Sequence, residues 1–434
     1  MKLTGWGRYP IIDANILNME TNEQAQSFLN THGELLVHAM GRSYGDSALA
    51  SNVISTRRMN RFIAFNHQAG ELTCEAGTSL SEIIRCVLPR GWFLPVTPGT
   101  QHVSIGGAIA ADVHGKNHHR DGCFSSCVKS IHILLADGRM ITCSKDENAD
   151  LFHATCGGMG LTGIILSATI SLLSVPSRII RQKIFKAKNL AHVFELFEEN
   201  VHWPYSVAWI DCQAQGPSMG RSLLMVGEHT EQGRLFVVRG KNLSVPFDFP
   251  RFTLNTYSIK LFNALYYHRI RKNVLENMVD IESFFYPLDA VEYWNRIYGK
   301  NGFTQYQFVL PKDVSFRGLK SILTRISATG LGSFLAVLKL FGPANDNFLS
   351  FPRQGYTLAL DFKIENKLFR LLDDLDKIVC EFGGRIYLAK DVRTKPGTFA
   401  QGYTRLEEFQ KVASSYDPHR KFTSKQSQRL RLRP

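Results

Sequence analysis

The chain lacks the short motifs that mark several common classes of protein. Its eight cysteines include no Cys-x-x-Cys pair, so zinc-ribbon and thioredoxin-like sites have little support. It contains neither a G-x-x-x-x-G-K-[ST] phosphate loop nor a convincing G-x-G-x-x-G motif between a strand and a helix. No internal repeat or low-complexity tract is found. We therefore expect reduced core cysteines and a function that depends on other motifs.

Long apolar runs are also missing. The N-terminal stretch MKLTGWGRYPII lacks the apolar core of a secretory signal peptide. No stretch approaches the ~18 consecutive apolar residues of a transmembrane helix. We expect a cytoplasmic protein, and peripheral contact with the inner face of a membrane stays open.

The composition is that of a globular protein with an excess of positive charge. The 434 residues suffice for two or three domains, and 44% are hydrophobic. The formal net charge of +13 suits an anionic partner, which is a nucleic acid, an acidic membrane surface or a phosphorylated substrate. The basic residues are spread, and no helix-turn-helix, zinc finger or base-stacking motif accompanies them, so we expect no nucleic-acid partner.

Turn signals and periodicity predict three regions. Residues 1–178 have short strands, helices and many glycine turns; residues 179–384 have longer strands and more aromatics; residues 385–434 form a tail that could return to the first region. A helix is expected after Thr78, capped by Ser79 or Ser81, and a hairpin turn at 137–138. Further expected elements are the strands GELLVHAM, SVAWIDCQ, TQYQFVLP, FLAVLKLFG, YTLALDF and RIYLAKD and the helix IENKLFRLLDDLDKIVCEFGG. The pattern predicts an α+β fold.

Three glycine-rich runs stand out, at 41–46, 98–115 and 157–163. Glycine lets the backbone approach a ligand closely, and the N–H groups of such loops can bind phosphate oxygens. The run at 95–119 is too apolar for a surface loop and too glycine-rich for an ordinary strand or helix. These runs are either ligand-binding loops or the glycine-rich turns of a β-heavy domain.

Six motifs occur in an order that is typical of one flavoenzyme family: GRSYGD, PGTQHVSIGGAIAADVHGKNHH, LFHATCGGMGLTGII, QYQFVLP, GGRIYLAKD and DPHRKF. Together they resemble the vanillyl-alcohol oxidase/p-cresol methylhydroxylase (PCMH) type of FAD-dependent oxidoreductase over nearly the full chain. The set is most similar to the branch that oxidises decaprenylphosphoryl-β-D-ribose, the flavin subunit of a 2'-epimerase in cell-wall arabinan synthesis. The resemblance implies a two-domain FAD-binding fold with an inserted antiparallel-sheet substrate domain.

The resemblance also implies how FAD is held. Residues 37–47 would wrap the pyrophosphate. The implied cofactor contacts are Gly41, Arg42, Ser43, Tyr44, Gly45, Asp46, Ser47, Gly99, Ser104, Ile105, Gly106, Gly107, Ala111, Asp112, Val113, His114, Ile165 and Tyr387. Related enzymes often bind FAD covalently through a histidine in the first glycine loop, where this chain has Arg42. Cys123, Cys127 and His114 are the other conceivable anchors, and we predict non-covalent FAD.

Lys390 is the expected catalytic residue, because the GGRIYLAKD motif resembles the C-terminal motif of aldonolactone oxidases, which also ends in a lysine. A desolvated lysine beside the flavin could lower the alcohol's pKa, act as a base or stabilise anionic reduced flavin. Without the resemblance, Lys390 is interpreted as a solvated lysine at the end of a strand.

His118 and His119 lack a third ligand at a sensible spacing, so we predict no metal site.

The substrate contacts are expected on the wall opposite the flavin. Gln305 and Gln307 are two apart on a probable strand and share one face, where paired amides would suit sugar hydroxyls. Lys339 is either at the solvent edge of an apolar strand or a buried cation that awaits an anion, and the resemblance favours the second. It also places Tyr44, His114 and Lys116 in this cavity, with Lys116 near the substrate phosphate.

The function that the resemblance implies is oxidation of the 2'-hydroxyl of a polyprenyl-phosphoryl pentose to the 2'-keto intermediate. The resemblance also implies an NAD(P)H-dependent short-chain reductase as the partner enzyme, and this chain has no nicotinamide motif of its own. The alternative is an FAD-dependent oxidase of a soluble sugar, alditol or aldonolactone.

The resemblance implies that residues 244–273 form a mobile cover over the substrate site. Their mix of aromatic and basic side chains also suits a membrane interface or an ordinary packed helix. Thr357 and Ala359 replace an asparagine and a cysteine of the mycobacterial oxidases, so fine specificity does not carry over.

Overall fold

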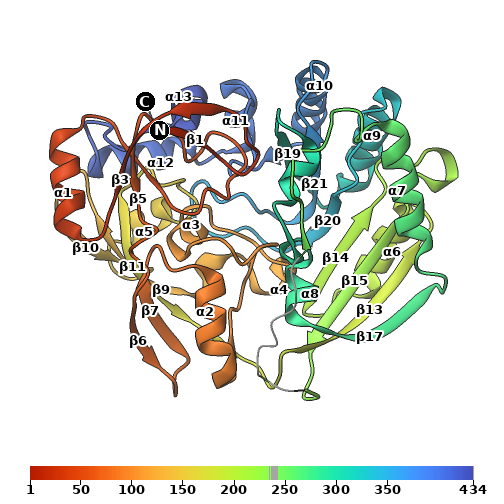
Figure 1. Ribbon diagram of the computed structural model, residues 1–434, viewed down its shortest axis with the longest axis horizontal. Helices are drawn as coiled ribbons and strands as arrows, with labels where there is room; N and C mark the ends of the chain where they lie inside the picture. The colour runs from red at the N-terminus through yellow and green to blue at the C-terminus, as the bar shows by residue number, and fades with distance from the viewer. Residues whose placement is uncertain (234, 236–242, 434) are drawn as a thin grey trace.

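The computed structural model describes residues 1–233, 235 and 243–433, and its strands form two main regions (Figure 1). The predicted second domain, 179–384, includes residues 234 and 236–242, and the predicted tail includes residue 434; these lie outside the described residues. The α+β fold class is confirmed.

The first region is built on two sheets. A five-stranded antiparallel sheet has the order β10-β9-β11-β7-β6, and a three-stranded parallel sheet has the order β3-β5-β4. Its strands are β1 (Lys2–Thr4), β2 (Ile11–Asp13), β3 (Asn15–Asn18), β4 (Leu36–His38), β5 (Asn52–Ser55), β6 (Phe62–Asn66), β7 (Glu71–Glu75), β8 (Trp92–Phe93), β9 (Val128–Leu134), β10 (Met140–Cys143), β11 (Ile164–Ser171) and β12 (Leu173–Ser174). Its helices are α1 (Asn22–Thr31), α2 (Leu80–Val87), α3 (Ile105–Ala110), α4 (His118–Asp121) and α5 (Ala149–Thr155).

Local sequence signals explain several of these elements. The Ser79 side chain caps α2 in a capping box with Glu82, and Gly91 adopts a left-handed conformation after the following turn, so the predicted helix is confirmed. Strands β9 and β10 pair with Met140 opposite Leu134, which confirms the predicted hairpin.

The expectation that the run at 95–119 forms neither strand nor helix is wrong for its centre, which is α3. Ser104 caps this short helix by accepting a hydrogen bond from the Gly107 N–H. A Cβ on Gly106 would lie 3.0 Å from both the Cβ and the carbonyl oxygen of Ala76, which directly follows β7. The glycines are therefore tolerated in a helix because they let it pack directly against backbone.

The second region is one eight-stranded sheet with the order β17-β13-β15-β14-β20-β21-β19-β22, antiparallel at each pairing. The strands of this region are β13 (Ile179–Ala187), β14 (Tyr205–Ile210), β15 (Ser222–His229), β16 (Leu243–Ser244), β17 (Val274–Asp280), β18 (Val291–Glu292), β19 (Phe303–Pro311), β20 (Ala336–Phe341), β21 (Gly355–Lys363) and β22 (Arg385–Ile386). The helices are α6 (Leu190–Glu199), α7 (Thr256–His268), α8 (Ile281–Phe285), α9 (Ser315–Thr329) and α10 (Leu368–Glu381).

Alternation along these strands gives the sheet two different faces. Tyr306, Phe308, Leu358 and Leu360 belong to a large apolar core with helices α6, α9 and α10, which cover that face (Figure 1). The residues between them in sequence point the other way, toward the first region. This face forms one wall of the site described below.

The C-terminal segment contains α11 (Pro396–Gly402), α12 (Leu406–Tyr416) and α13 (Lys425–Leu430), which lie beside the first region in Figure 1. Leu35 and Phe422 form a β-bridge, and Arg429 pairs with Asp46 at 2.8 Å. Nearer its start, the predicted strand at 385–391 is wrong beyond Ile386, because only β22 pairs with β19 and the chain then turns. Lys390 therefore lies in this turn, with its N–H bonded to the Tyr387 carbonyl.

Candidate active site

A cavity of about 800 Å³ lies between the two regions. Its first wall comes from the loop that follows β4, the loop before α3, α3 itself and the start of β11. Its second wall comes from β14, β19, β20 and β21, and the turn at 387–390 closes one side. The volume is near the upper end of the ~300–1,000 Å³ range of small-molecule sites.

The first wall presents backbone and small residues to the cavity. Gly41 has a φ of +59°, and a Cβ there would lie 3.0 Å from Nε2 of His38. A Cβ on Gly99 would meet nothing within 4 Å, so this backbone faces open space. Such a wall fits a ligand that lies against main-chain N–H groups, as a pyrophosphate does, and it also fits a flat ring.

Most of the predicted cofactor residues line this cavity. They are Gly41, Arg42, Ser43, Tyr44, Ser47, Gly99, Ser104, Gly106, Gly107, Ala111, Val113, His114, Ile165 and Tyr387. Residues that were not singled out as cofactor contacts also line the first wall, among them Thr56, Pro98, Ala110 and Gly160. Pro98, Ala110 and Gly160 lie within the glycine-rich runs, whereas Thr56 lies outside them and carried no sequence signal.

Four predicted cofactor residues, Gly45, Asp46, Ile105 and Asp112, are not among the lining residues. A Cβ on Gly45 would lie 1.9 Å from the Asp391 carbonyl oxygen. Asp46 binds Arg429, and Ile105 is fully buried in the core. The structure therefore gives these three residues packing roles behind the wall.

Asp112 has a similar supporting role. Its carboxylate accepts hydrogen bonds from the amides of Asn345 and Asn347 at 2.8 Å and from the Ser350 hydroxyl at 2.7 Å. Its φ is +39°, an uncommon value for a residue with a side chain. The carboxylate thus ties the end of α3 to the loop between β20 and β21, instead of pointing into the cavity.

The second wall carries polar side chains on alternate positions. Gln305 and Gln307 of β19 both line the cavity, as the shared-face prediction requires. The Gln307 amide donates to the Thr357 hydroxyl at 3.2 Å, and its nitrogen lies 3.1 Å from Nε2 of His114. Thr357 and Ala359 of β21 also line the cavity, and the small Ala359 side chain leaves room for a ligand.

His114 joins the two walls. Its ring lies 4.8 Å from the Phe341 ring and 5.3 Å from the Tyr387 ring, measured between centroids. Burial, followed by the charge on Lys339, lowers the pKa of His114 well below its ordinary value. The imidazole is therefore neutral at physiological pH and can share a hydrogen bond with Gln307.

Three lysines line the cavity: Lys116, Lys339 and Lys390. Burial lowers the pKa of Lys339 to about 8 and, helped by the charge on Lys339, that of Lys116 to about 7. Lys116 donates to the Phe284 carbonyl, and its Nζ lies 4.5 Å from the centre of the Phe284 ring. An anionic group between these lysines would favour their charged forms.

Lys390 lies against the first loop, with Nζ 3.9 Å from the centre of the Tyr44 ring. Burial lowers its pKa to about 7, while Asp361 acts in the opposite direction. An amine with a pKa near neutrality can accept a proton and release it again during turnover.

Sequence reasoning missed Asp361 and Tyr298. Asp361 follows Thr357 and Ala359 on the same face of β21, and this alternation is a signal that could have found it. It is 1% exposed, and its Oδ1 accepts a hydrogen bond of 2.5 Å from the Gln305 amide. Tyr298 ends a short helical turn at 294–298 that gave no sequence signal.

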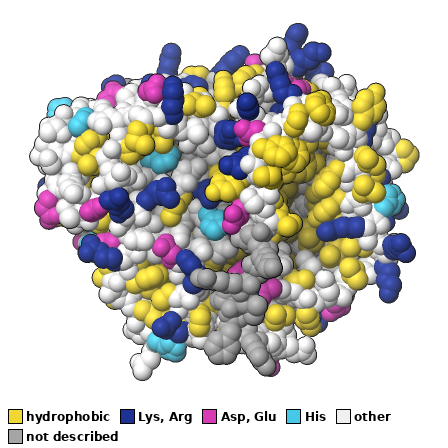
Figure 2. All heavy atoms as spheres, in the orientation of Figure 1, with side chains coloured by type: hydrophobic (Ala, Val, Ile, Leu, Met, Phe, Trp, Pro, Cys, Tyr) yellow, Lys and Arg dark blue, Asp and Glu magenta, His cyan; other side chains and the backbone are white. Residues whose placement is uncertain are grey.

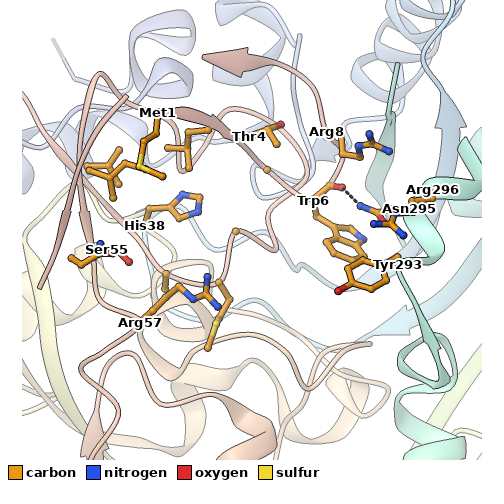
Figure 3. A pocket seen from close by; sticks show the side chains of 18 residues that line it. Met1, Thr4, Trp6, Arg8, His38, Ser55, Arg57, Tyr293, Asn295 and Arg296 are labelled. Atoms are coloured by element: carbon orange, nitrogen blue, oxygen red, sulfur yellow. Dashed lines mark hydrogen bonds between the residues drawn. The ribbon is translucent and has the colours of Figure 1, made fainter. Parts of the chain in front are cut away.

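A second cavity of about 570 Å³ adjoins the first (Figure 3). In Figure 3, His38, Ser55 and Arg57 lie on one side of it, and Trp6 and Tyr293 lie on the other. Residues that line both cavities are Trp6, Ala39, Met40 and Gly41. The two cavities therefore share the start of the first glycine loop, 39–41, as part of their lining.

The other candidate ligands and anchors have structural partners. Nδ1 of His118 accepts the Gly342 N–H at 3.2 Å, and Nε2 of His119 lies 2.9 Å from the Trp203 carbonyl. Burial raises the pKa of Cys127 to about 12, and burial together with Asp112 raises that of Cys123. Within the described ranges, no group of three or more His, Cys, Asp or Glu residues could hold a metal ion.

Six of the eight cysteines are buried, as expected for core residues, whereas Cys86 and Cys380 are partly exposed. All eight are free thiols. Among the described residues, no helix has both the length and the apolar character needed to cross a membrane.

Comparison with known proteins shows which proteins this chain is similar to. The model of the FAD binding domain matches residues 19–144. The decaprenylphosphoryl-β-D-ribose oxidase of Mycolicibacterium smegmatis is 35% identical over 99% of this chain and 97% of its own length. A Streptomyces coelicolor protein described as uncharacterised, in the mprA 5' region, is 30% identical over 82% of this chain and its full length. A putative D-arabinono-1,4-lactone oxidase of Neurospora crassa is 28% identical over 37% of this chain and 28% of its own length.

Proposed function

The chain belongs to the FAD-dependent oxidoreductase family of decaprenylphosphoryl-β-D-ribose oxidase, and from this premise we propose that it oxidises the 2'-hydroxyl of a polyprenyl-phosphoryl pentose. The product would be the 2'-keto sugar lipid. Bound FAD supplies the acceptor for the hydride and its two electrons. The first wall, with its glycine loops, would hold the cofactor, and the second wall would hold the sugar.

The observation that carries this proposal is the set of three lysines that line a cavity together with two amides, of which Gln307 is buried and Gln305 is half-buried. Lys116 and Lys339 favour an anionic group, and a sugar phosphate supplies one. Gln305 and Gln307 can hydrogen-bond sugar hydroxyls, since both line the cavity. Lys390 would take the hydroxyl proton as its amine becomes an ammonium.

The lipid part of the substrate has a matching surface at the mouth of the cavity. Phe262, Tyr266 and Arg269, on and just after α7, line the cavity. Other side chains of the same helix point outward, with Tyr257 84% and Leu261 62% exposed. In Figure 2, hydrophobic side chains gather on the right of the molecule, where α7 lies in Figure 1. Aromatic and apolar groups beside basic residues suit a membrane interface, so we infer peripheral contact with the inner face of the membrane.

The partner enzyme follows from the chemistry. Oxidation at C2' leaves a ketone, and inversion of the ribose to arabinose requires a hydride to return to the opposite face. No nicotinamide-binding motif occurs in this sequence, so a separate NAD(P)H-dependent short-chain reductase would complete the epimerisation for arabinan synthesis.

The alternative, an oxidase of a soluble sugar, alditol or aldonolactone, has support from the partial match to the lactone oxidase. A substrate comparison separates the two functions. The purified enzyme would be given synthetic polyprenyl-phosphoryl ribose, ribose 5-phosphate, alditols and aldonolactones under the same conditions, and each product reduced with borodeuteride. We expect deuterium at C2' of the lipid-linked pentose. Oxidation of the soluble compounds alone would favour the alternative.

Membrane contact needs its own test. Sedimentation with anionic vesicles should fall for Leu261→Asp, because this change places a carboxylate on the exposed face of α7. Ile63→Asp is the matched control, since Ile63 is 58% exposed on β6 of the first region. Equal vesicle binding by both variants would contradict the membrane contact and leave the oxidation proposal intact.

A further inference from the structure

Asp361 is a buried carboxylate that the proposed chemistry has not yet used, on the cavity-facing side of the sheet but outside the cavity lining. It lies directly opposite Gln305 in the antiparallel pairing of β21 with β19. The Gln305 amide donates to one carboxylate oxygen at 2.5 Å, and the Asp361 N–H donates to the Ser333 hydroxyl at 3.1 Å. Because both side chains are on the same face of the sheet and only Gln305 lines the cavity, Asp361 fixes Gln305 from the side.

The second oxygen of Asp361 lies near the Tyr298 hydroxyl. Among the described residues, neither this oxygen nor the Tyr298 hydroxyl has a hydrogen-bond partner within normal distance. The two groups are nonetheless close enough for each to affect the other's pKa. The Tyr298 ring is held in place by stacking on Phe303, with ring centroids 4.3 Å apart and planes 7° apart. A rigid hydroxyl therefore accompanies the carboxylate.

Lys390 belongs to the same cluster of side chains as Asp361, because the Tyr44 ring beneath its Nζ lies 5.2 Å from the Phe303 ring on which Tyr298 stacks. The groups that surround the Lys390 ammonium are the Tyr44 ring, Lys339 on β20, neutral His114 and Asp361 on β21. Burial and the charge on Lys339 both favour the neutral amine, whereas Asp361 favours the ammonium. In return, burial raises the pKa of Asp361, and Gln305 and Lys390 lower it. The charge state of Lys390 thus depends on the carboxylate.

We propose that Asp361 is a positioning residue for the oxidation, which fixes the Gln305 amide at the cavity wall and sets the protonation of Lys390. The proton that leaves the substrate oxygen passes to Nζ of Lys390, and Asp361 stabilises the ammonium that forms. The hydride and its electron pair belong to the acceptor chemistry of bound FAD. The inference rests on the proposed function only in assigning Lys390 as the proton acceptor.

The test measures the charge of Lys390 directly, without substrate. The holoenzyme would be acetylated with a trace of acetic anhydride over a pH series, and the modified lysines quantified by mass spectrometry. Only the neutral amine reacts, so the labelling rate of each lysine reports its own protonation. In the natural protein, we expect the Lys390 labelling midpoint near pH 7.

Asp361→Asn keeps the size of the side chain and an oxygen for the Gln305 hydrogen bond, but it removes the charge. We expect the Lys390 midpoint to fall by about one pH unit, a tenfold change in the protonation equilibrium. Lys116 is the internal control, because it lines the same cavity and owes its lowered pKa to burial and Lys339. Its midpoint should not move. An unchanged Lys390 midpoint, or an equal fall at Lys116, would overturn the proposal.

A second pair of variants covers the case in which Asp361→Asn does not fold. Tyr298→Phe removes the hydroxyl beside Asp361 and should lower the Lys390 midpoint in the same direction by less. Tyr306→Phe is the matched control, since the buried Tyr306 hydroxyl bonds Asp376 at 3.0 Å on the opposite face of β19. A shift in Tyr306→Phe equal to that in Tyr298→Phe would contradict the role of Asp361.

The kinetic consequence distinguishes this inference from the proposed function. If Lys390 accepts the proton, the acid limb of flavin reduction should move with the labelling midpoint in each variant. A midpoint that moves while the acid limb stays fixed would refute the role of Asp361 in the reaction. Absence of reduction by any lipid-linked pentose would instead refute the proposed function and leave the labelling result standing.

Discussion

The two walls of the cavity differ in what they offer a ligand. The first wall presents backbone to the cavity at Gly41, Gly99 and α3, where larger side chains would obstruct a ligand. The second wall presents side chains, including two amides and a lysine on alternate strand positions. A backbone wall recognises a cofactor by shape and by N–H groups, whereas a side-chain wall is tuned by burial and by neighbouring charges. Substitutions in the first wall should therefore change cofactor affinity, and substitutions in the second wall should change properties that depend on charge and pH.

The largest effect is expected at the edge where the walls meet. Lys390→Ala should slow flavin reduction by about 10²–10⁴-fold, the usual contribution of a positioned acid–base group, because the hydroxyl proton loses its acceptor. FAD content should stay the same. Anaerobic stopped-flow mixing with polyprenyl-phosphoryl ribose measures the rate. Lys395→Ala, at an exposed position before α11, is the control. Equal rates in the two variants would remove Lys390 from the chemistry.

A smaller effect on stability should come from the second wall alone. Lys339→Met should raise the free energy of unfolding by about 3 kcal/mol at pH 7, because the folded protein holds this amine at a pKa near 8 and the unfolded chain holds it near 10.4. Between these values the unfolded chain binds more protons, so stability of the natural protein rises with pH.

The gain from Lys339→Met is therefore largest below pH 8 and fades as the pH rises toward 10.4. Urea unfolding of both proteins at saturating FAD over a pH series measures it. A gain that does not vary with pH would show that packing, and not the lysine's charge, is responsible.

A substitution in the first wall should instead weaken the binding of FAD. Gly41→Ala places a Cβ at a positive φ and 3.0 Å from His38, at a cost of about 1 kcal/mol. We expect about fivefold weaker FAD binding in fluorescence titrations, with the pH dependence of flavin reduction unchanged. Gly33→Ala is the control, because a Cβ there meets nothing within 4 Å. A shifted pH dependence of flavin reduction without a loss of FAD affinity would contradict this difference between the two walls.

The smallest expected effect is a null result. Acid precipitation should release all the FAD into the supernatant, because Arg42 stands where related enzymes have a histidine and the thiols of Cys123 and Cys127 are buried with raised pKa values. Flavin absorbance in the precipitated protein would identify a covalent bond and contradict this prediction.

The same contrast explains what the sequence could predict. Glycine motifs are local, so GRSYGD and GGAIAADVHG identified the first wall, and alternation correctly placed Gln305 and Gln307 together. Asp361 and Tyr298 escaped notice because their proximity to Lys390 depends on how β21, a short helical turn and the turn after β22 pack together. Asp46 and Asp112 were expected at the cofactor from their place in the motifs, and a motif does not reveal that their carboxylates bind Arg429 and Asn347.

The helix α3 was also missed, because its glycines are unfavourable in an isolated helix and are stabilised here by contact with the backbone of Ala76. Whether a lysine is buried, and therefore near its titration point at neutral pH, likewise follows only from the packed structure.

The most direct measurement is an anaerobic titration of the purified holoenzyme with synthetic polyprenyl-phosphoryl ribose, followed through the flavin absorption band. The account predicts that the band bleaches in proportion to the lipid-linked sugar added and that ribose 5-phosphate and alditols leave it unchanged. A band that persists with the lipid-linked sugar and bleaches with a soluble alcohol would contradict it.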